Sequence, residues 1–116
     1  EPILYGWKDG AQHYWCGARD QGDVWHIKKP HKNDLHPTMK PVELMERAVR
    51  NSSKTRDIVL DPFGGSGTTG AAAAELGRNF ILCDQNPESI AVMKERFAKS
   101  GVEVSFEKSP RSPKRK

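Results

Sequence analysis

A glycine-rich stretch, Asp61-Pro62-Phe63-Gly64-Gly65-Ser66-Gly67-Thr68-Thr69, lies between the apolar run Ile58-Val59-Leu60 and the alanine-rich run from Ala71 to Leu76. A strand that ends in an acid, turns through three glycines and enters a helix is typical of the nucleotide-binding corner of an α/β sheet. Glycines let the backbone bend sharply and let a ligand approach main-chain N–H groups without meeting a Cβ atom. The positive end of the helix dipole then points at the ligand. We call residues 61–69 the glycine corner and expect a nucleotide-like ligand there.

The glycine corner excludes one class of nucleotide site and leaves another open. No lysine lies between Asp61 and Arg78, which excludes the phosphate-binding loop of nucleoside triphosphatases. The spacing from Gly65 to Gly70 fits the dinucleotide pattern Gly-x-Gly-x-x-Gly. A nicotinamide-dependent oxidoreductase therefore stays open as one hypothesis.

A second acid, Asp84, closes the next apolar run, Phe80-Ile81-Leu82-Cys83. An acid at the end of this second strand, about 20 residues after the corner, accepts hydrogen bonds from ribose hydroxyls in dinucleotide sites. The alternative role for Asp84 is to cap the helix that begins near Pro87. We favour the ribose role because the glycine corner lies upstream.

Length and composition bound the class of protein. The 116 residues predict one domain or part of one, with a modest core because only 35% of the residues are hydrophobic. No window is long and apolar enough for a membrane span, and no signal-peptide pattern opens the sequence. The two cysteines, Cys16 and Cys83, form no metal-binding spacing. We expect a cytoplasmic protein without a metal site, in which Cys83 is a core thiol of a buried strand.

The formal net charge of +4 comes from the last residues of the chain. Five of the 19 lysines and arginines lie within residues 108–116, which contain no acid, so the other residues carry 14 bases against 15 acids. This basic tail lacks apolar residues and is expected to be disordered. Its composition is equally compatible with contact to nucleic-acid phosphates and with a solvated end.

Three segments are expected along the chain: an aromatic-rich β-hairpin segment over residues 1–35, an α/β part over 36–107 and the basic tail over 108–116. All three tryptophans lie in the aromatic segment, and at least two of them are expected in the core.

Helix and strand signals follow one another through the α/β part. A helix follows Pro41 and ends near Arg50 to Ser53, and its apolar residues recur at helical spacing. The expected order after it is the strand before the corner, a helix that stops at Gly77, a strand over 79–84, a helix that starts at Asn86-Pro87 and ends at Gly101, and a third strand over 102–106. The order predicts an α/β fold with part of a Rossmann-like sheet, β-α-β-α-β.

Three motifs in this order resemble the carboxyl-terminal part of bacterial or phage DNA amino-methyltransferases. These enzymes use S-adenosylmethionine to methylate adenine N6 or cytosine N4, and in one permuted class the cofactor motifs follow the catalytic one. The motifs are His36-Pro37-Thr38-Met39-Lys40-Pro41, the glycine corner and Asp84; Leu4-Tyr5-Gly6-Trp7-Lys8 through His13-Tyr14-Trp15 also resembles an upstream segment of phage-type members. The resemblance covers roughly residues 1–98, and oxidoreductases have no reason to carry the motif from His36 to Pro41.

The resemblance implies a role for each matching residue toward S-adenosylmethionine. Gly65 and Gly67 would let the backbone lie against the methionine portion, and main-chain N–H groups near Ser66 to Thr69 would receive its carboxylate. Phe63 would form an apolar wall, and Asp84 would accept from the ribose. The implied cofactor-binding residues are Thr38, Lys40, Asp61, Phe63, Gly65, Ser66, Gly67, Thr68 and Asp84. For His36, a role in ordering the turn is equally open.

The sequence departs from the family at the catalytic step. The family transfers the methyl group at an Asp/Asn/Ser-Pro-Pro-aromatic motif that holds a flipped base. No two prolines are adjacent in this chain, so no residue is assigned a catalytic role. We expect a carboxyl-terminal portion of a longer enzyme, with DNA and the missing amino-terminal half as partners and a second copy as a further candidate. The alternative is a non-catalytic module that binds S-adenosylmethionine or DNA.

Overall fold

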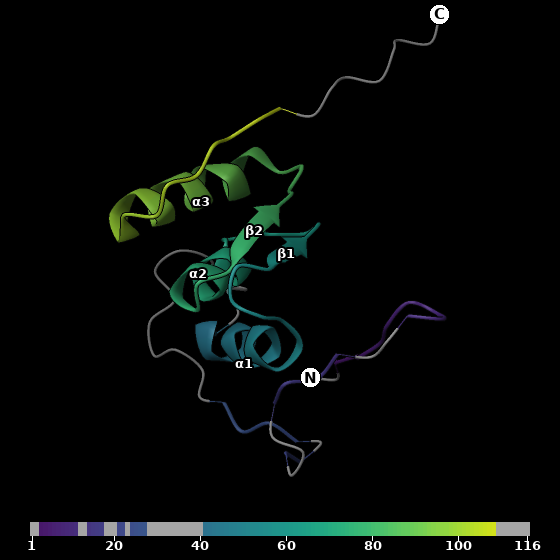
Figure 1. Cartoon of the computed structure of the whole chain (residues 1–116). Helices are drawn as coiled ribbons and strands as arrows, with labels where there is room; N and C mark the ends of the chain where they lie inside the picture. Colours follow the sequence, from purple (N-terminus) through teal and green to yellow (C-terminus); the bar gives the residue numbers. More distant parts are fainter. Residues whose placement is uncertain (1–2, 12–13, 18–20, 23, 28–40, 109–116) are drawn as a thin grey trace, which may run out of the picture.

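The computed structural model describes residues 3–11, 14–17, 21–22, 24–27 and 41–108. The elements in these ranges are α1 (Val42–Ser52), β1 (Ile58–Asp61), α2 (Thr68–Glu75), β2 (Asn79–Leu82) and α3 (Pro87–Ser100) (Figure 1). The predicted α/β class is confirmed. None of the helices in the described part of the chain has the length and apolar character that crossing a membrane requires.

The two strands pair in parallel, with Ile58 opposite Asn79 and Asp61 opposite Leu82. Helix α2 makes the crossover between them and packs against both strands. Because the strands run in the same direction, their carboxyl ends lie at one edge of the sheet. The glycine corner after β1 and the loop after β2 therefore meet at this edge.

The helices begin and end where the sequence predicts. Asn86 caps α3 because its Oδ1 accepts from the Glu88 N–H at 2.9 Å, and Pro87 takes the first helical position. Gly101 follows α3 with a φ of 73°, and Gly77 follows α2 with a φ of 77°. Both angles lie in the left-handed region that glycine adopts without a steric cost.

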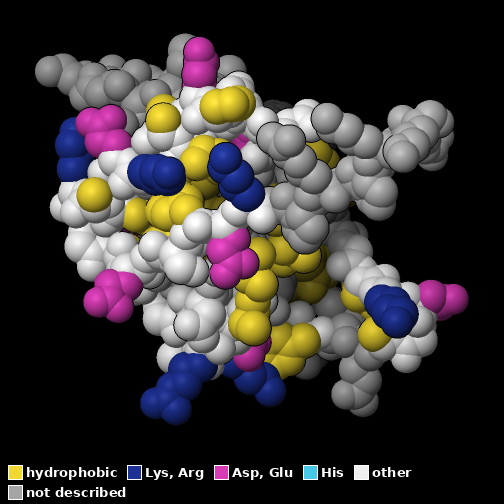
Figure 2. Space-filling view, turned by 90° about the horizontal axis from the view of Figure 1, so that it is seen from above, with side chains coloured by type: hydrophobic (Ala, Val, Ile, Leu, Met, Phe, Trp, Pro, Cys, Tyr) yellow, Lys and Arg dark blue, Asp and Glu magenta, His cyan; other side chains and the backbone are white. Residues whose placement is uncertain are grey.

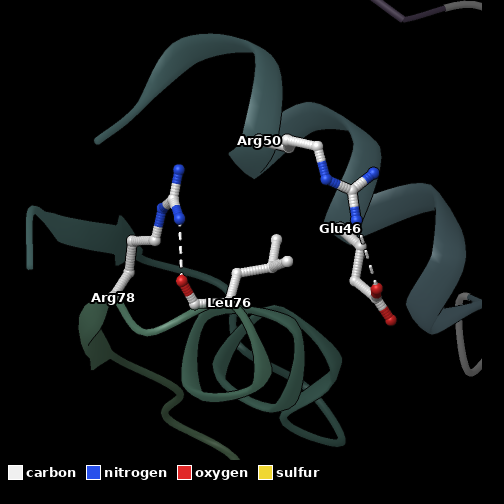
Figure 3. A network of polar contacts seen from close by, with 4 residues as sticks. All are labelled: Glu46, Arg50, Leu76 and Arg78. Carbon is white, nitrogen blue, oxygen red and sulfur yellow. Dashed lines mark hydrogen bonds and ion pairs between the residues drawn. The ribbon is translucent and has the colours of Figure 1, made fainter. Parts of the chain in front are cut away.

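Helix α1 packs against α2 on the side away from α3, as Figure 1 shows. Arg78, the residue before β2, links the ends of α1 and α2, since its guanidinium donates to the carbonyls of Ser53 and Leu76 at 2.7 Å each. Figure 3 shows the Leu76 contact beside the ion pair of Arg50 with Glu46. The pKa of Glu46 is nevertheless raised, first by burial and then by the neighbouring Glu75.

The core lies on one face of the sheet. Phe80 of β2 stacks on Phe97 of α3 with ring centroids 5.3 Å apart, and Phe97 and Met93 are each only 2% exposed. Gly70 lets α2 approach this cluster, because a Cβ atom there would come within 3.0 Å of Phe97, Leu82 and Phe80.

The opposite face of the sheet is apolar and uncovered. Ile58, Leu60 and Ile81 are 66%, 61% and 51% exposed. Figure 2 shows hydrophobic side chains at the surface, between charged side chains, on the side seen from above. Cys83 is exposed as well, so the prediction of a core thiol is wrong. Its strand is covered on one side only, whereas a parallel sheet is ordinarily covered on both.

The third strand expected over 102–106 is not formed. The chain turns at Gly101 and runs back along α3 (Figure 1), where the Val102 N–H donates to the Phe97 carbonyl at 3.1 Å and Lys94 lies over the Phe106 ring. An alternating segment becomes a strand only when it reaches a partner edge, and here helix contacts hold it away from β2.

The aromatic segment forms no strand in its described residues, which corrects the expected hairpin. Hydrogen bonds of the main chain and of side chains attach the segment to α1 instead. The Cys16 main-chain N–H donates to the Asn51 carbonyl at 2.7 Å, and the side-chain amides of Gln21 and Asn51 exchange two hydrogen bonds. Trp7 is 58% exposed, and Trp15 and Trp25 are half-buried, so the expectation of core tryptophans is also wrong. These rings contact tyrosine and arginine side chains.

Candidate functional site

The glycine corner is held from the end of its own strand by Asp61. Its two carboxylate oxygens accept from the Phe63 N–H at 3.0 Å and from the Thr69 hydroxyl at 2.6 Å. The second contact reaches across the turn to the first residues of α2. Asp61 therefore fixes the angle between β1 and α2, and it keeps lone pairs that can accept from a ligand cation.

Glycine is required at three positions of the corner for different physical reasons. A Cβ at Gly64 would lie 2.7 Å from Met93 Cε and one at Gly67 would lie 3.1 Å from Phe97, so both glycines allow close packing on α3. Gly67 also has a φ of 86° as the N-cap of α2. Gly65 has a φ of 54°, and a Cβ there would meet only the Phe63 carbonyl oxygen, at 4.0 Å. Of the three, Gly65 is the one whose missing side chain leaves room at the surface.

Asp84 joins the two strand ends. Its Oδ2 accepts from the Gly65 N–H at 2.9 Å, and its Oδ1 accepts from the Asn86 N–H at 2.8 Å. The helix cap that was the alternative role for Asp84 belongs to Asn86. Each carboxylate oxygen has a second lone pair, so these contacts hold Asp84 in place without preventing it from accepting further donors.

The side chains of Ser66 and Thr68 point inward. They are 6% and 5% exposed, and their hydroxyl oxygens lie 3.2 Å apart. Arg96 of α3 donates from Nη1 to the Ser66 carbonyl at 3.3 Å and to the Thr68 hydroxyl at 3.1 Å. The corner thus offers a ligand its main chain rather than these two hydroxyls.

Arg96 was missed from the sequence. Its position three residues after Met93 and next to Phe97 places it on the buried face of α3, which is an unusual place for an arginine. An arginine among apolar residues of one helix face is the sequence signal that could have indicated Arg96.

A pocket of about 440 Å³ lies between the loops that follow the two strands. Phe63 is 86% exposed beside it, and Asp84 supplies the carboxylate of its wall. The lining residues are Pro62, Phe63, Cys83, Asp84, Gln85 and Asn86. An apolar ring and a charged acceptor on opposite loops suit a ligand with a flat apolar part and a polyhydroxyl part.

The predicted site residues divide into those that the structure describes and those that it does not. Thr38 and Lys40 lie outside the described residues, as do His36 and residues 109–116 of the basic tail. Of the placed ones, the structure brings Gly65 and Asp84 into direct contact and sets Phe63 beside the same pocket. No group of His, Cys, Asp and Glu side chains suited to a metal ion occurs among the residues that the structure describes.

Comparison with known proteins identifies the family. The family model described as "DNA methylase" matches residues 7–95. The chain belongs to this DNA methylase family. Among its relatives, a Type II methyltransferase of Streptococcus pneumoniae, M2.DpnII, is 39% identical over 111 residues, which cover 84% of this chain and 41% of that protein. The Type II methyltransferase M1.MboII of Moraxella bovis is 47% identical over 78 residues, which cover 60% of this chain and 30% of that protein.

Solved structures of methyltransferases share the fold. The M1.HpyAVI-SAM complex is 36% identical with a TM-score of 0.64, over 74% of this chain and 44% of that chain. The cytosine-N4-specific PvuII DNA methyltransferase is 31% identical with a TM-score of 0.56, over 61% of this chain and 29% of that chain. The chain spans 20–41% of the length of five of the curated relatives it matches.

The contacts of Asp84 predict a stability effect. Replacement of Asp84 by alanine removes the acceptor for two main-chain N–H groups, so the free energy of unfolding should fall by about 1–3 kcal/mol. Urea denaturation measures this. Glu103→Ala is the control, because Glu103 is an exposed acid after α3, and its effect should stay within about 0.5 kcal/mol. Equal midpoints for the two variants would show that Asp84 does not join the strand ends.

Proposed function

We propose that this chain is the cofactor-binding part of a DNA amino-methyltransferase that uses S-adenosylmethionine to methylate adenine N6 or cytosine N4. The observation that carries the proposal is the contact between Asp84 and Gly65 beside the pocket, in a chain of the DNA methylase family. Two proteins with the same fold support it, since M1.HpyAVI forms a complex with SAM and the PvuII methyltransferase is specific for cytosine N4.

The described residues fit the chemical groups of S-adenosylmethionine. Asp84 is a charged acceptor for the ribose hydroxyls, and Phe63 offers an apolar wall for the adenine. The first N–H groups of α2 suit the carboxylate because they lie at the positive end of the helix dipole. Asp61 suits the ammonium group. Thr38 and Lys40 are proposed to help at the carboxylate. When bound, the cofactor supplies the electrophilic methyl group.

The base-holding step is proposed to lie in another part of the enzyme. None of the 116 residues belongs to a Pro-Pro-aromatic motif that could hold and stack a flipped base. The proposal includes DNA as the substrate of the enzyme and the cytoplasm as its location. A non-catalytic module that binds the cofactor or DNA is the second candidate, and the same missing motif favours it.

The uncovered sheet face suggests how the rest of such an enzyme attaches. Ile58, Leu60 and Ile81 form an apolar surface on a parallel sheet, which proteins ordinarily bury under helices. We propose that the remaining part of a protein as long as the relatives packs on this face. Without it, a second copy of the chain would cover the apolar surface.

Cys83 gives a direct test of where the ligand binds. Because Cys83 lines the pocket and is exposed, bound S-adenosylhomocysteine should shield it from N-ethylmaleimide. At a ligand concentration about ten times Kd, its alkylation rate should fall about tenfold. Cys16 is exposed but lies beside the end of α1, so its rate is the internal control. Mass spectrometry of the peptides measures both rates, and equal rates at Cys83 with and without ligand would place the ligand elsewhere.

Gly65 tests the approach of the ligand to the main chain. Valine at Gly65 places a branched side chain where the ligand is proposed to approach the main chain, so affinity for S-adenosylhomocysteine should fall by more than about tenfold. Gly101→Val is matched, because Gly101 also has a positive φ and open surroundings but lies at the far end of α3. Calorimetry measures both affinities. Equal affinity of Gly65→Val and Gly101→Val would count against the corner as the site.

The isolated chain should transfer no methyl group to DNA, since no residue in it can hold a flipped base. Incubation with tritiated S-adenosylmethionine and mixed-sequence DNA measures this. Clear incorporation of tritium into the DNA would overturn the proposal that the base-holding step lies in another part of the enzyme.

The uncovered sheet face predicts the oligomeric state. Light scattering on the same preparation should give the mass of a dimer. Leu60→Glu, which puts a charge on the uncovered face, should give a monomer. A monomeric wild type at all concentrations would contradict the proposed cover by a second copy.

A further inference from the structure

The inner side of the glycine corner, away from the pocket, is held by one side chain from a different helix. Arg96 of α3 reaches the Ser66 carbonyl and the Thr68 hydroxyl from the same nitrogen, Nη1. The guanidinium is about half buried, and burial lowers the pKa of Arg96. An arginine still keeps its charge under these conditions. The corner therefore has a fixed cation behind it.

The contacts of Arg96 determine how the main chain of the corner is oriented. The peptide group between Ser66 and Gly67 is held at both ends, because its carbonyl accepts from Arg96 and its N–H donates to the Gly64 carbonyl at 2.9 Å. The Thr68 hydroxyl lies within hydrogen-bond distance of Arg96 and of the Ser66 hydroxyl. Helix α2 has no side-chain cap, because its N-cap residue, Gly67, has no side chain. Its N–H groups are left for another acceptor.

The charge of Arg96 has a second consequence. A cation beside the first turn of a helix is unfavourable, because the helix dipole already places partial positive charge there. An anionic group bound at the corner would relieve this repulsion. Arg96 thus makes the N-terminus of α2 a better site for an anion at some cost to the empty protein.

We propose that Arg96 is a positioning residue that prepares the glycine corner for the carboxylate end of the cofactor. The inference rests on the proposed binding of S-adenosylmethionine and adds to it which end of the ligand depends on α3. A residue that only supports the fold would affect every part of the ligand equally. Arg96 should affect the amino-acid end alone.

Two ligands separate these cases. S-adenosylhomocysteine carries the carboxylate, whereas 5′-methylthioadenosine keeps the adenine, the ribose and the sulfur without the amino-acid end. Calorimetry with the full chain at a temperature where all variants are folded measures both affinities. For Arg96→Met, affinity for S-adenosylhomocysteine should fall about tenfold, while affinity for methylthioadenosine should stay within about twofold. Lys94→Met, which removes a charge from an exposed position of the same helix, is the control and should leave both affinities unchanged.

Arg96→Lys keeps the test decisive if the methionine variant does not fold. Lysine preserves the charge but not the planar donor group, so the loss for S-adenosylhomocysteine should be about threefold, again without loss for methylthioadenosine. Equal losses for the two ligands, or no loss for either, would overturn the role of Arg96 and leave the proposed function standing. A wild-type chain that binds neither ligand would instead overturn the proposed function, and the role of Arg96 with it.

Discussion

The hydrogen bond from the Gly65 main chain to the Asp84 carboxylate joins the loops that follow two neighbouring strands. Each strand is only four residues long, so the direction of these loops depends strongly on contacts beyond the sheet. Asp84 also holds the Asn86 N–H, and Asn86 in turn starts α3. One carboxylate thus connects the glycine corner, the end of β2 and the helix that supplies the core.

The same helix completes the corner from the opposite side. Met93 and Phe97 fill the space that glycines leave, and Arg96 between them reaches the main chain of the corner. Small residues on α2 and large ones on α3 allow these two helices to approach closely. A methyl group added at Gly70 of α2 would already collide with Phe97 of α3. Packing and the polar contacts of the corner therefore depend on one another.

The uncovered face of the sheet shows what this part of the fold lacks. Gly70 of α2 and Phe97 of α3 pack against Phe80 on one side of the sheet, and the apolar side chains on the other side remain exposed. In a parallel sheet such an arrangement loses much of the stabilisation that burial of Ile58, Leu60 and Ile81 would provide. This loss is the physical reason for the proposal that further chain, or a second copy, packs on that face.

Elements whose signals are local could be predicted from the sequence alone. The glycine corner, the N-cap at Asn86 and the stops at Gly77 and Gly101 all depend on the backbone preferences of a few neighbouring residues, and the structure has them at the predicted positions. The family membership was likewise predictable, because its motifs are short and contiguous. The contacts of each side chain, in contrast, depend on how the elements pack together. The segment 102–106 alternates like a strand but lies along α3, and Cys83 is exposed because no layer covers its side of the sheet. Ser66 and Thr68 face Arg96 rather than the pocket, and Arg96 itself lies 30 residues from Ser66 along the chain. Such contacts depend on which elements are present to pack together, and a periodic pattern within one segment does not contain that information.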